Sequence, residues 1–450
     1  MQTADEVLQE ATKAHLAGEW GKAEQLYCRI IASLEDHPAA YFFLGTLYAQ
    51  ALAPGRAVTF LKRAIELNPS NHEAMQNLGA VYSQLENKEK AVAYYQQALK
   101  LNKSANLLSN LSGAYLNNAT PETALQYADE ALKLRPDFPE AGNHRALALL
   151  ELGRFEEGWK QYDSRMDCTG TNNANSMTRQ RFFRRPYTVP MWTGQKGVKL
   201  AIHGEQGLGD EILFLTCLKQ IREQYDVDVA IECNPRLVKL ISISTGAPCF
   251  GTHDELVSGC KPDYYIPMGS LPRFVWPVKP NAYLQPTTTI ERGDRFRLGL
   301  SWFGGSDLTH TALRNTLVQN WLPLSDKHDD VVSLQYGDRA QEAALIGAKH
   351  NAGDIADLDR LAALIKSCDL VVSVCNTTIH MAGALGVPCF VLVPAKPAWR
   401  YGLTGESMVW YDSVRLIRQQ PNEEWPSVID RARSAVINFR RLQEAKRKVA

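Results

Sequence analysis

The sequence has no excess of charge of either sign, because 49 Lys and Arg residues balance 49 Asp and Glu residues. A chain without net charge does not attract nucleic acid or an anionic membrane through its overall field, although a local basic patch can still do so. The sequence also lacks an apolar run long enough to cross a bilayer, and its opening residues lack the pattern of a secretion signal. We therefore expect a cytoplasmic protein with no membrane-inserted segment.

Motifs for bound metals and common cofactors are missing as well. None of the nine cysteines belongs to a C-x-x-C pair, which favours reduced thiols over a disulfide or zinc framework. The glycine-rich turns match neither the dinucleotide motif G-x-G-x-x-G nor a phosphate-binding loop ending in Gly-Lys-Ser/Thr. No D-x-D-like metal motif suggests itself in the segments expected to line a cleft. We therefore expect no cofactor and no metal ion.

An alanine recurs at a nearly constant interval in the first third of the chain. Ala23, Ala57, Ala91 and Ala124 are separated by 34, 34 and 33 residues, which is the period of the tetratricopeptide repeat (TPR). Small residues let paired helices approach closely, an aromatic residue fills the gap, and proline ends the second helix. The other recurring positions are Leu44-Gly45 and Leu78-Gly79, Tyr48 and Tyr82, Ala64, Ala98 and Ala131, and Pro69 and Pro136.

The repeats predict an α-solenoid of about five units over residues 1–166, in which the last unit is modified and caps the stack. A solenoid of this kind forms a concave groove that commonly holds a peptide or another protein. The alternatives are a spacer or an oligomerisation arm, and we favour partner binding. The sequence does not indicate which side chains contact the partner.

Residues 167–197 are polar, then basic, and show no periodicity, so they are expected to form a linker or an ordered crossing segment. Arginines alternate there with two phenylalanines and could reach a phosphate-bearing ligand. A solvated surface is the commoner role of such a cluster, and we favour it. The residues concerned are Arg179, Arg181, Phe182, Phe183, Arg184 and Arg185.

Beyond residue 197, apolar strands alternate with helices, which is typical of parallel α/β sheets. Two sets of such units, over 198–290 and 291–424, predict two Rossmann-like domains that face each other across a cleft. Residues 425–450 predict a long basic helix. The expected strands are 198–203, 227–233, a short one near 249–250, 264–268, 296–302, 331–336, 370–374 and 389–394, with helices over 211–225 and 358–367 and after residue 376.

The turn after strand 370–374 carries polar residues at the start of a helix. Asn376, Thr377 and Thr378 offer side-chain donors where the helix directs its unpaired N–H groups at a ligand, and His380 follows one turn later. Ligands of α/β sheets collect at the carboxyl ends of strands, so this turn is a candidate anion site. The same residues can instead form an ordinary helix cap beside a half-buried histidine.

The turn after strand 198–203 contains three glycines and ends in two acids. Gly204, Gly207 and Gly209 leave the backbone open to a ligand, and Asp210 and Glu211 occupy the first turn of the next helix. Acids at that position usually interact favourably with the helix dipole. A carboxylate at the mouth of a cleft can also accept a proton from a hydroxyl group, which is the role of a general base.

Five segments together resemble bacterial proteins that join tetratricopeptide repeats to a domain like the lipopolysaccharide heptosyltransferases. They are 203–214, 298–305, 332–338, 373–388 and 399–402, and the resemblance extends over nearly the whole chain. It implies a GT-B fold and an inverting, metal-independent glycosyltransferase. Its implied substrates are a nucleotide-sugar donor and a protein acceptor held by the repeats, with flagellin or another exported surface protein as the acceptor by analogy.

The resemblance also implies roles for individual residues. Asp210 matches the catalytic base, and Glu205, Gly207 and Gly209 belong to the loop on the acceptor side. Cys375 and Asn376 stand where the family has aspartate and threonine, so the contacts to sugar or phosphate must differ. The implied donor-binding residues are Ser301, Trp302, Arg314, Gln335, Tyr336, Asn376, Thr377, Thr378 and His380.

Two other functions remain open from the sequence. The chain could be a scaffold whose repeats bind a partner while the transferase domain has lost its chemistry. It could also be a glycosyltransferase that acts on lipopolysaccharide or a lipid-linked glycan, although the peptide-type groove favours a protein acceptor.

Overall fold

The computed structural model describes residues 2–168, 188–304 and 314–449, and the chain divides into two compact units, Met1–Leu149 and Leu150–Ala450. The basic cluster between residues 179 and 185 lies outside the described residues.

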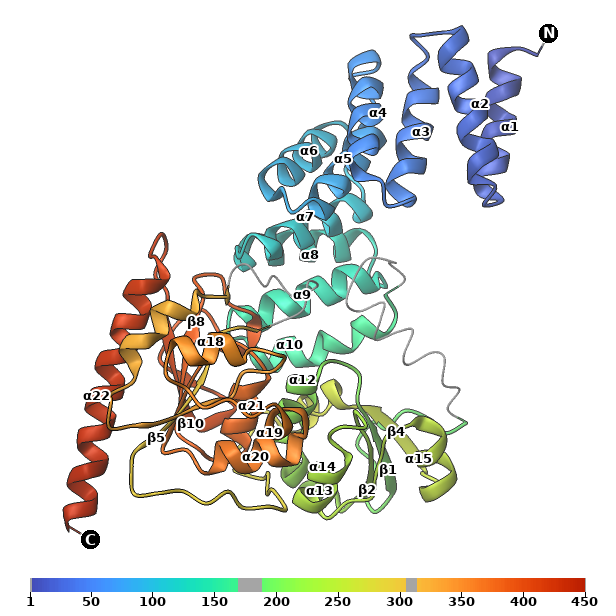
Figure 1. The fold of residues 1–450 in the computed structure, drawn as a ribbon. Coiled ribbons are helices and arrows are strands. Elements are labelled where there is room, and N and C mark those ends of the chain that lie inside the picture. Colours follow the sequence, from blue (N-terminus) through green and yellow to red (C-terminus); the bar gives the residue numbers. More distant parts are fainter. Residues whose placement is uncertain (1, 169–187, 305–313, 450) are drawn as a thin grey trace. The chain divides into compact units, whose positions relative to one another are not determined.

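The first unit consists of helices that pack in successive pairs (Figure 1). Proline at the first position begins α3, α4 and α8, where its missing N–H group costs nothing, and Asn71, Asn87 and Ser104 cap α5, α6 and α7 through their side chains. The helices are α1 (Ala4–Leu16), α2 (Trp20–Ser33), α3 (Pro38–Gln50), α4 (Pro54–Leu67), α5 (His72–Gln84), α6 (Lys88–Leu101), α7 (Ala105–Asn117), α8 (Pro121–Leu134) and α9 (Pro139–Glu151), the last of which crosses the boundary between the units.

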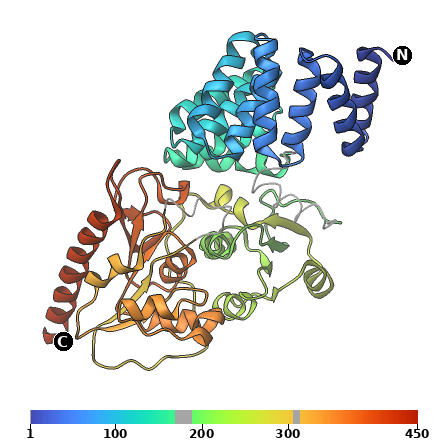
Figure 2. The same cartoon turned by 45° about the horizontal axis from the view of Figure 1, so that its top comes forward.

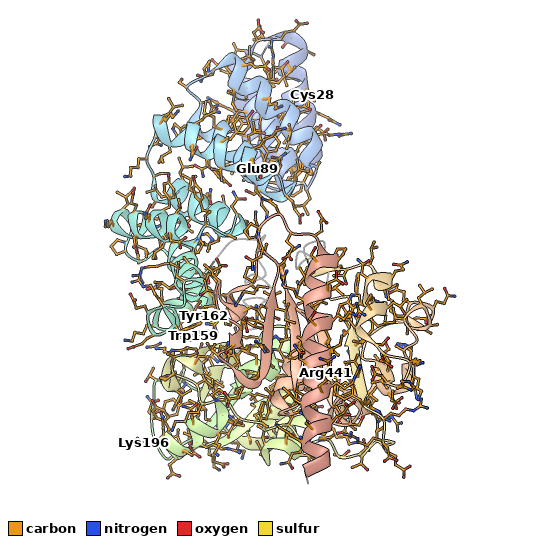
Figure 3. All side chains as sticks on the ribbon, turned by 90° about the vertical axis from the view of Figure 1, so that its left-hand side faces the viewer. Cys28, Glu89, Trp159, Tyr162, Lys196 and Arg441 are labelled. Carbon is orange, nitrogen blue, oxygen red and sulfur yellow. The ribbon has the colours of Figure 1, made fainter. Side chains whose placement is uncertain are left out.

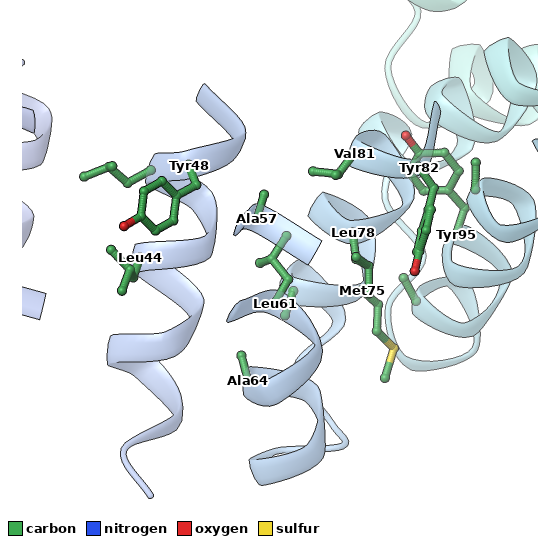
Figure 4. Packing of buried hydrophobic residues seen from close by; sticks show 14 of the residues in the cluster. Leu44, Tyr48, Ala57, Leu61, Ala64, Met75, Leu78, Val81, Tyr82 and Tyr95 are labelled. Atoms are coloured by element: carbon green, nitrogen blue, oxygen red, sulfur yellow. The ribbon is translucent and has the colours of Figure 1, made fainter. Parts of the chain in front are cut away.

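The recurring residues of the repeat form the core of this unit. Figure 4 shows Leu44, Tyr48, Ala57 and Leu61 among the packed side chains of neighbouring helices. The glycine of the Leu-Gly pair allows this packing, because a Cβ atom at Gly79 would lie 2.7 Å from Cδ1 of Tyr95 on the next helix. The glycine therefore recurs at this position of the repeat because a larger residue would clash with the next helix.

Replacing Gly79 by alanine is expected to lower the free energy of unfolding by about 1–3 kcal/mol, because the added methyl group overpacks the contact with Tyr95. Gly55 on α4 is the matched control, since a Cβ atom there would meet nothing within 4 Å. Gly55→Ala should be neutral or stabilising by up to about 1 kcal/mol through helix propensity. Urea unfolding followed by circular dichroism measures both changes, and equal effects would contradict the steric explanation.

The second unit contains the whole of α10 (Phe155–Tyr162), which the sequence predicts as part of the last repeat. Trp159 of α10 is 1% exposed, and its ring makes edge contacts with Phe214, Trp399 and Trp410 of the α/β region. Figure 3 labels Trp159 beside Tyr162 on this helix. By its contacts, α10 is therefore part of the second unit.

Described residues of the second unit form two sheets. A four-stranded parallel sheet has the order β3-β2-β1-β4, and a six-stranded sheet has the order β6-β5-β7-β8-β10-β9, in which only the β9–β10 pair is antiparallel. The strands are β1 (Lys199–His203), β2 (Asp228–Glu232), β3 (Cys249–Phe250), β4 (Tyr264–Pro267), β5 (Arg297–Ser301), β6 (Asp330–Ser333), β7 (Leu370–Val374), β8 (Cys389–Val393), β9 (Ser407–Met408) and β10 (Tyr411–Arg418).

Helices cover these sheets. The helix predicted over 211–225 is two helices, and the first one ends at Leu215, where the Thr216 hydroxyl group donates to the carbonyl oxygen of Leu213 (2.6 Å). The final helix packs against β8 and β10 (Figure 2). The described helices are η1 (Asp163–Met166), α12 (Leu208–Leu215), α13 (Leu218–Tyr225), α14 (Val238–Thr245), α15 (His253–Cys260), η2 (Met268–Ser270), α16 (Pro272–Val275), η4 (Val318–Leu324), α18 (Ala340–Leu345), α19 (Ala352–Ala356), α20 (Leu358–Lys366), α21 (Thr377–Ala384), η5 (Trp399–Tyr401) and α22 (Trp425–Val449).

Candidate functional site

The glycine turn and the polar turn after β7 lie in direct contact, although they follow strands of different sheets. Gly207 caps α12 and Asn376 caps α21, so both helices begin at this contact. A Cβ atom at Gly209 would lie 2.9 Å from Cδ2 of His380 and 3.5 Å from Cα of Thr377. Because only glycine allows this approach, residue 209 brings the starts of two helices together at one place.

Asp210 of the glycine turn forms an ion pair with Arg400 of η5. The Arg400 Nε–H group donates to Asp210 Oδ1 at 2.6 Å, and its Nη2 group reaches Gln206 Oε1 at 3.4 Å. The guanidinium group also lies over the ring of Trp399, 4.6 Å from its centroid. Sequence reasoning gave Arg400 no role, although it stands in the W-R-Y-G segment that carries part of the resemblance.

His380 is buried beside this ion pair, with 4% of its surface exposed. Burial, together with the smaller effect of the positive charge of Arg400, lowers the pKa of His380 to about 3. Its Nδ1 atom has no hydrogen-bond partner among the described residues. His380 is therefore a neutral imidazole whose Nδ1 atom can form one hydrogen bond with a ligand. It contributes no positive charge to the site.

The lowered pKa of His380 predicts a loss of stability as the pH falls. Between pH 6.5, where an ordinary histidine titrates, and about 3, the unfolded chain binds a proton that the folded chain excludes. The contribution is thus complete above pH 6.5 and declines below it. We expect His380→Asn to show a smaller drop in melting temperature between pH 7.5 and 5 than the unsubstituted chain, whereas the exposed control His328→Asn keeps the full drop. Equal drops in all three proteins would contradict the assignment.

Asn376 serves as a structural cap in this structure. Its Oδ1 atom accepts from the Thr378 N–H group (2.9 Å) and from the Ser373 hydroxyl group (3.0 Å), and its amide donates to Ser301 Oγ (2.8 Å). The side chain is thus fully used in joining α21 to the ends of β5 and β7. Thr377 is the partly exposed residue of the turn, whereas Thr378 is buried.

Three of the residues predicted to lie near base and ribose are enclosed in the protein. Gln335 is fully buried and accepts from the Trp302 and Phe303 N–H groups at 3.0 and 2.8 Å. Ser301 is also fully buried, and the Trp302 indole donates to Glu342 at 2.6 Å. These hydrogen bonds connect the end of β5 to the segment that follows β6. Their role is therefore to stabilise the protein next to the polar turn after β7. Tyr336, in contrast, is 40% exposed.

Arg314 and Cys375 adjoin the end of β7. Arg314 donates to the carbonyl oxygen of Cys375 at 2.9 Å, which places a second guanidinium group beside the start of α21. The Cys375 thiol is buried and lies 3.6 Å from the carbonyl oxygen of Leu392, and burial raises its pKa to about 12. The thiol is therefore protonated and faces the protein interior.

Glu205, predicted to lie on the acceptor side, is buried in a different ion pair. Its carboxylate accepts from Arg165 Nη2 at 2.6 Å and from Arg165 Nε at 3.0 Å, and it also accepts from the Gly269 N–H group at 2.6 Å. Arg165 belongs to η1, directly after α10. The pair joins η1 to the glycine turn, so Glu205 anchors the turn and is not presented to an acceptor.

Comparisons with known proteins identify the helical repeats. Two family models described as tetratricopeptide repeat match residues 72–104 and 110–166. The N-terminal helices are tetratricopeptide repeats. TPR helices of this kind indicate binding of a protein or peptide partner. Among the described residues, no helix combines the length and the apolar character that a membrane span requires.

The chain is also similar to Protein FlbA of Caulobacter vibrioides, with 27% identity over 502 aligned positions that cover 94% of this chain and 82% of FlbA. Solved structures that are similar to part of this chain cover 35–39% of its length. They are MamA (22% identity, TM-score 0.33, covering 36% of this chain and 92% of MamA), pilF of Pseudomonas aeruginosa (18%, 0.34, 39% and 80%) and YrrB, described as a TPR protein with an unusual peptide-binding site (21%, 0.29, 35% and 80%).

Proposed function

We propose that the protein is an inverting glycosyltransferase of the GT-B type that transfers a sugar from a nucleotide-sugar to a protein bound by its TPR helices. The observation that supports this most is the contact of Gly209 with His380 and Thr377, because it brings the first turn of α12, which contains Asp210, against the start of α21. A helix start, Arg400 and Arg314 supply positive potential there, which suits a diphosphate. Transfer of a sugar to a hydroxyl group requires a base that accepts the hydroxyl proton and a neighbouring anion site that stabilises the leaving group.

In the proposed reaction, Asp210 accepts the proton of an acceptor hydroxyl group while the oxygen attacks the anomeric carbon of the sugar. The bond between that carbon and the diphosphate oxygen breaks, and the leaving nucleotide takes the electron pair. The N–H groups of α21, the Arg314 guanidinium group and neutral His380 stabilise the charge that develops on the leaving group. A bound diphosphate gives Arg400 a second anionic partner and thereby releases Asp210 to act as the base.

Nucleotide binding at α21 is the first part of the proposal to test. Thermal unfolding of the full chain with UDP, GDP, ADP, CDP and CMP in turn should show a selective rise in melting temperature with one of them. Thr377→Asp should remove that rise, because it places a negative charge at the first residue of α21 while remaining compatible with the helix. His380→Ala should weaken the response.

Ala352→Asp is the matched control for this experiment. It adds the same charge at the exposed first residue of another helix, α19, and should leave the nucleotide response unchanged. A rise that survives Thr377→Asp would place the nucleotide elsewhere. No rise with any nucleotide would favour a non-catalytic TPR scaffold, a function consistent with the enclosure of Ser301, Trp302 and Gln335.

The acceptor is tested after the donor is known. The TPR helices suit a protein acceptor, and flagellin or another exported surface protein is the first candidate by analogy with similar fused proteins. Transfer of labelled sugar from the identified nucleotide to such a protein, measured by intact mass, would establish the activity. Transfer only to lipopolysaccharide or a lipid-linked glycan would overturn the assignment of a protein acceptor.

A further inference from the structure

Two histidines and a glutamate meet in the four-stranded sheet domain of the second unit. His203 ends β1, Glu232 ends β2 and His253 begins α15, and one potential ligand atom from each lies within 4.8 Å of the other two. His203 Nδ1 and Glu232 Oε2 are 2.7 Å apart. No other group of three or more such side chains meets this criterion within the described residues.

The surrounding elements hold these three side chains in place. His203 and Glu232 are register partners at the carboxyl ends of adjacent parallel strands. The Thr252–Glu255 capping box fixes the first turn of α15, which contains His253. Buried Leu256 then packs α15 against the sheet. The cluster is therefore built on regular secondary structure, which positions ligands more precisely than loops do.

We propose that His203, Glu232 and His253 bind one divalent transition-metal ion, with zinc as the preferred ion. Two imidazole nitrogens and one carboxylate oxygen form a donor set that zinc uses in proteins, with water completing the coordination. Zinc lies about 2.0–2.2 Å from such ligands, which sets tetrahedral donor atoms about 3.3–3.6 Å apart. Donor atoms that are up to 4.8 Å apart therefore need to approach by up to roughly 1.5 Å, and the 2.7 Å pair of His203 and Glu232 needs to open slightly. Imidazole ligands disfavour magnesium and calcium, which prefer oxygen.

The site would fix the base of the glycine turn. His203 directly precedes Gly204, whose N–H group donates to the Glu232 carbonyl oxygen at 2.7 Å. A Cβ atom at Gly204 would also lie 2.5 Å from Glu211 Oε1, so the turn is tightly packed where it leaves β1. An ion held by both strand ends and α15 would restrain this segment. The role is positional, and the inference does not depend on the proposed transferase activity.

Zinc binding by the untagged full chain tests this inference. After equilibration with zinc and removal of excess, metal analysis should find about one ion per chain, and titration calorimetry should give the same stoichiometry. His253→Ala should weaken binding by at least about tenfold, because ligand loss has effects of that size or larger. His253 is only partly buried, so this variant is expected to fold, and His203→Gln provides a second one. The exposed control His328→Ala should bind like the unsubstituted chain.

Cobalt distinguishes this site from binding by cysteine. The chain has nine cysteines that could chelate a metal, and cobalt bound by thiolate shows an intense charge-transfer band in the near ultraviolet, which a site of imidazole and carboxylate lacks. Visible bands without that charge-transfer band, lost in His253→Ala, would support the site. Absence of bound metal, a thiolate band, or equal affinity in His253→Ala would overturn the proposal and leave His203 and Glu232 as a buried hydrogen-bonded pair.

Discussion

Replacement of Arg165 by alanine is expected to lower the free energy of unfolding of the second unit by about 3–5 kcal/mol. Arg165 is fully buried and forms a two-point ion pair with Glu205, which is 4% exposed. Removing the guanidinium group leaves a carboxylate in the interior without its counter-charge, and this is the costly way to break a buried pair. Chemical unfolding of the full chain, followed by tryptophan fluorescence, measures the loss.

Arg273→Ala is the matched control for this experiment. Arg273 is an exposed arginine that pairs with Asp163, and Asp163 also contacts Arg165. Because exposed pairs contribute little, the control should lose less than about 1 kcal/mol. Substituting both members of the buried pair by apolar residues of similar size, Arg165→Met with Glu205→Leu, should recover much of the stability. A loss in Arg165→Ala as small as in Arg273→Ala would show that Glu205 finds other partners.

Asp210→Asn is expected to reduce sugar transfer by about 10²–10⁴-fold, which is the usual contribution of a general base. The substitution removes proton acceptance but keeps a carbonyl oxygen that the Arg400 Nε–H group can still reach. The fold and the nucleotide response should therefore be retained. Initial transfer rates at saturating donor, measured once the donor and acceptor are identified, test this prediction.

Asp228→Asn is the matched control for the loss of a carboxylate. Asp228 is exposed and begins β2, at the opposite end of the strand from the glycine turn. Its substitution should leave transfer unchanged. Full activity in Asp210→Asn would remove the proposed base from the mechanism, whereas loss of both transfer and nucleotide response would indicate a structural role for the Asp210–Arg400 pair.

Local sequence patterns were sufficient for the elements whose residues are buried on both sides. The runs at β7 and β8 are entirely buried and, apart from Ser373, apolar, and each is a strand as predicted. The helix over 211–225 was wrong as a single element, because α12 ends at Leu215 and α13 begins at Leu218. The antiparallel β9 was not predicted, since two residues carry no periodicity.

Much of the candidate site could not be predicted, because its residues are brought together by contacts between positions that are far apart in the sequence. Asp210 and Arg400 are 190 positions apart, so no local pattern links them. Gln335 was predicted as a donor contact because it follows a strand, but its partners are backbone groups at the end of β5. The histidine and glutamate cluster was missed for the same reason, because adjacent strands and a following helix bring it together only in the fold.

The packing of α10 has a consequence for how this protein could be divided or recombined. A cut after residue 166 would follow the repeat pattern, but it would leave the indole of Trp159 without Phe214, Trp399 and Trp410 around it. It would also remove Arg165, the ion-pair partner of Glu205. The helix α10 therefore belongs structurally to the α/β region. A chimera that joins this region to another repeat array must include α10 and η1 as the first elements of the α/β region.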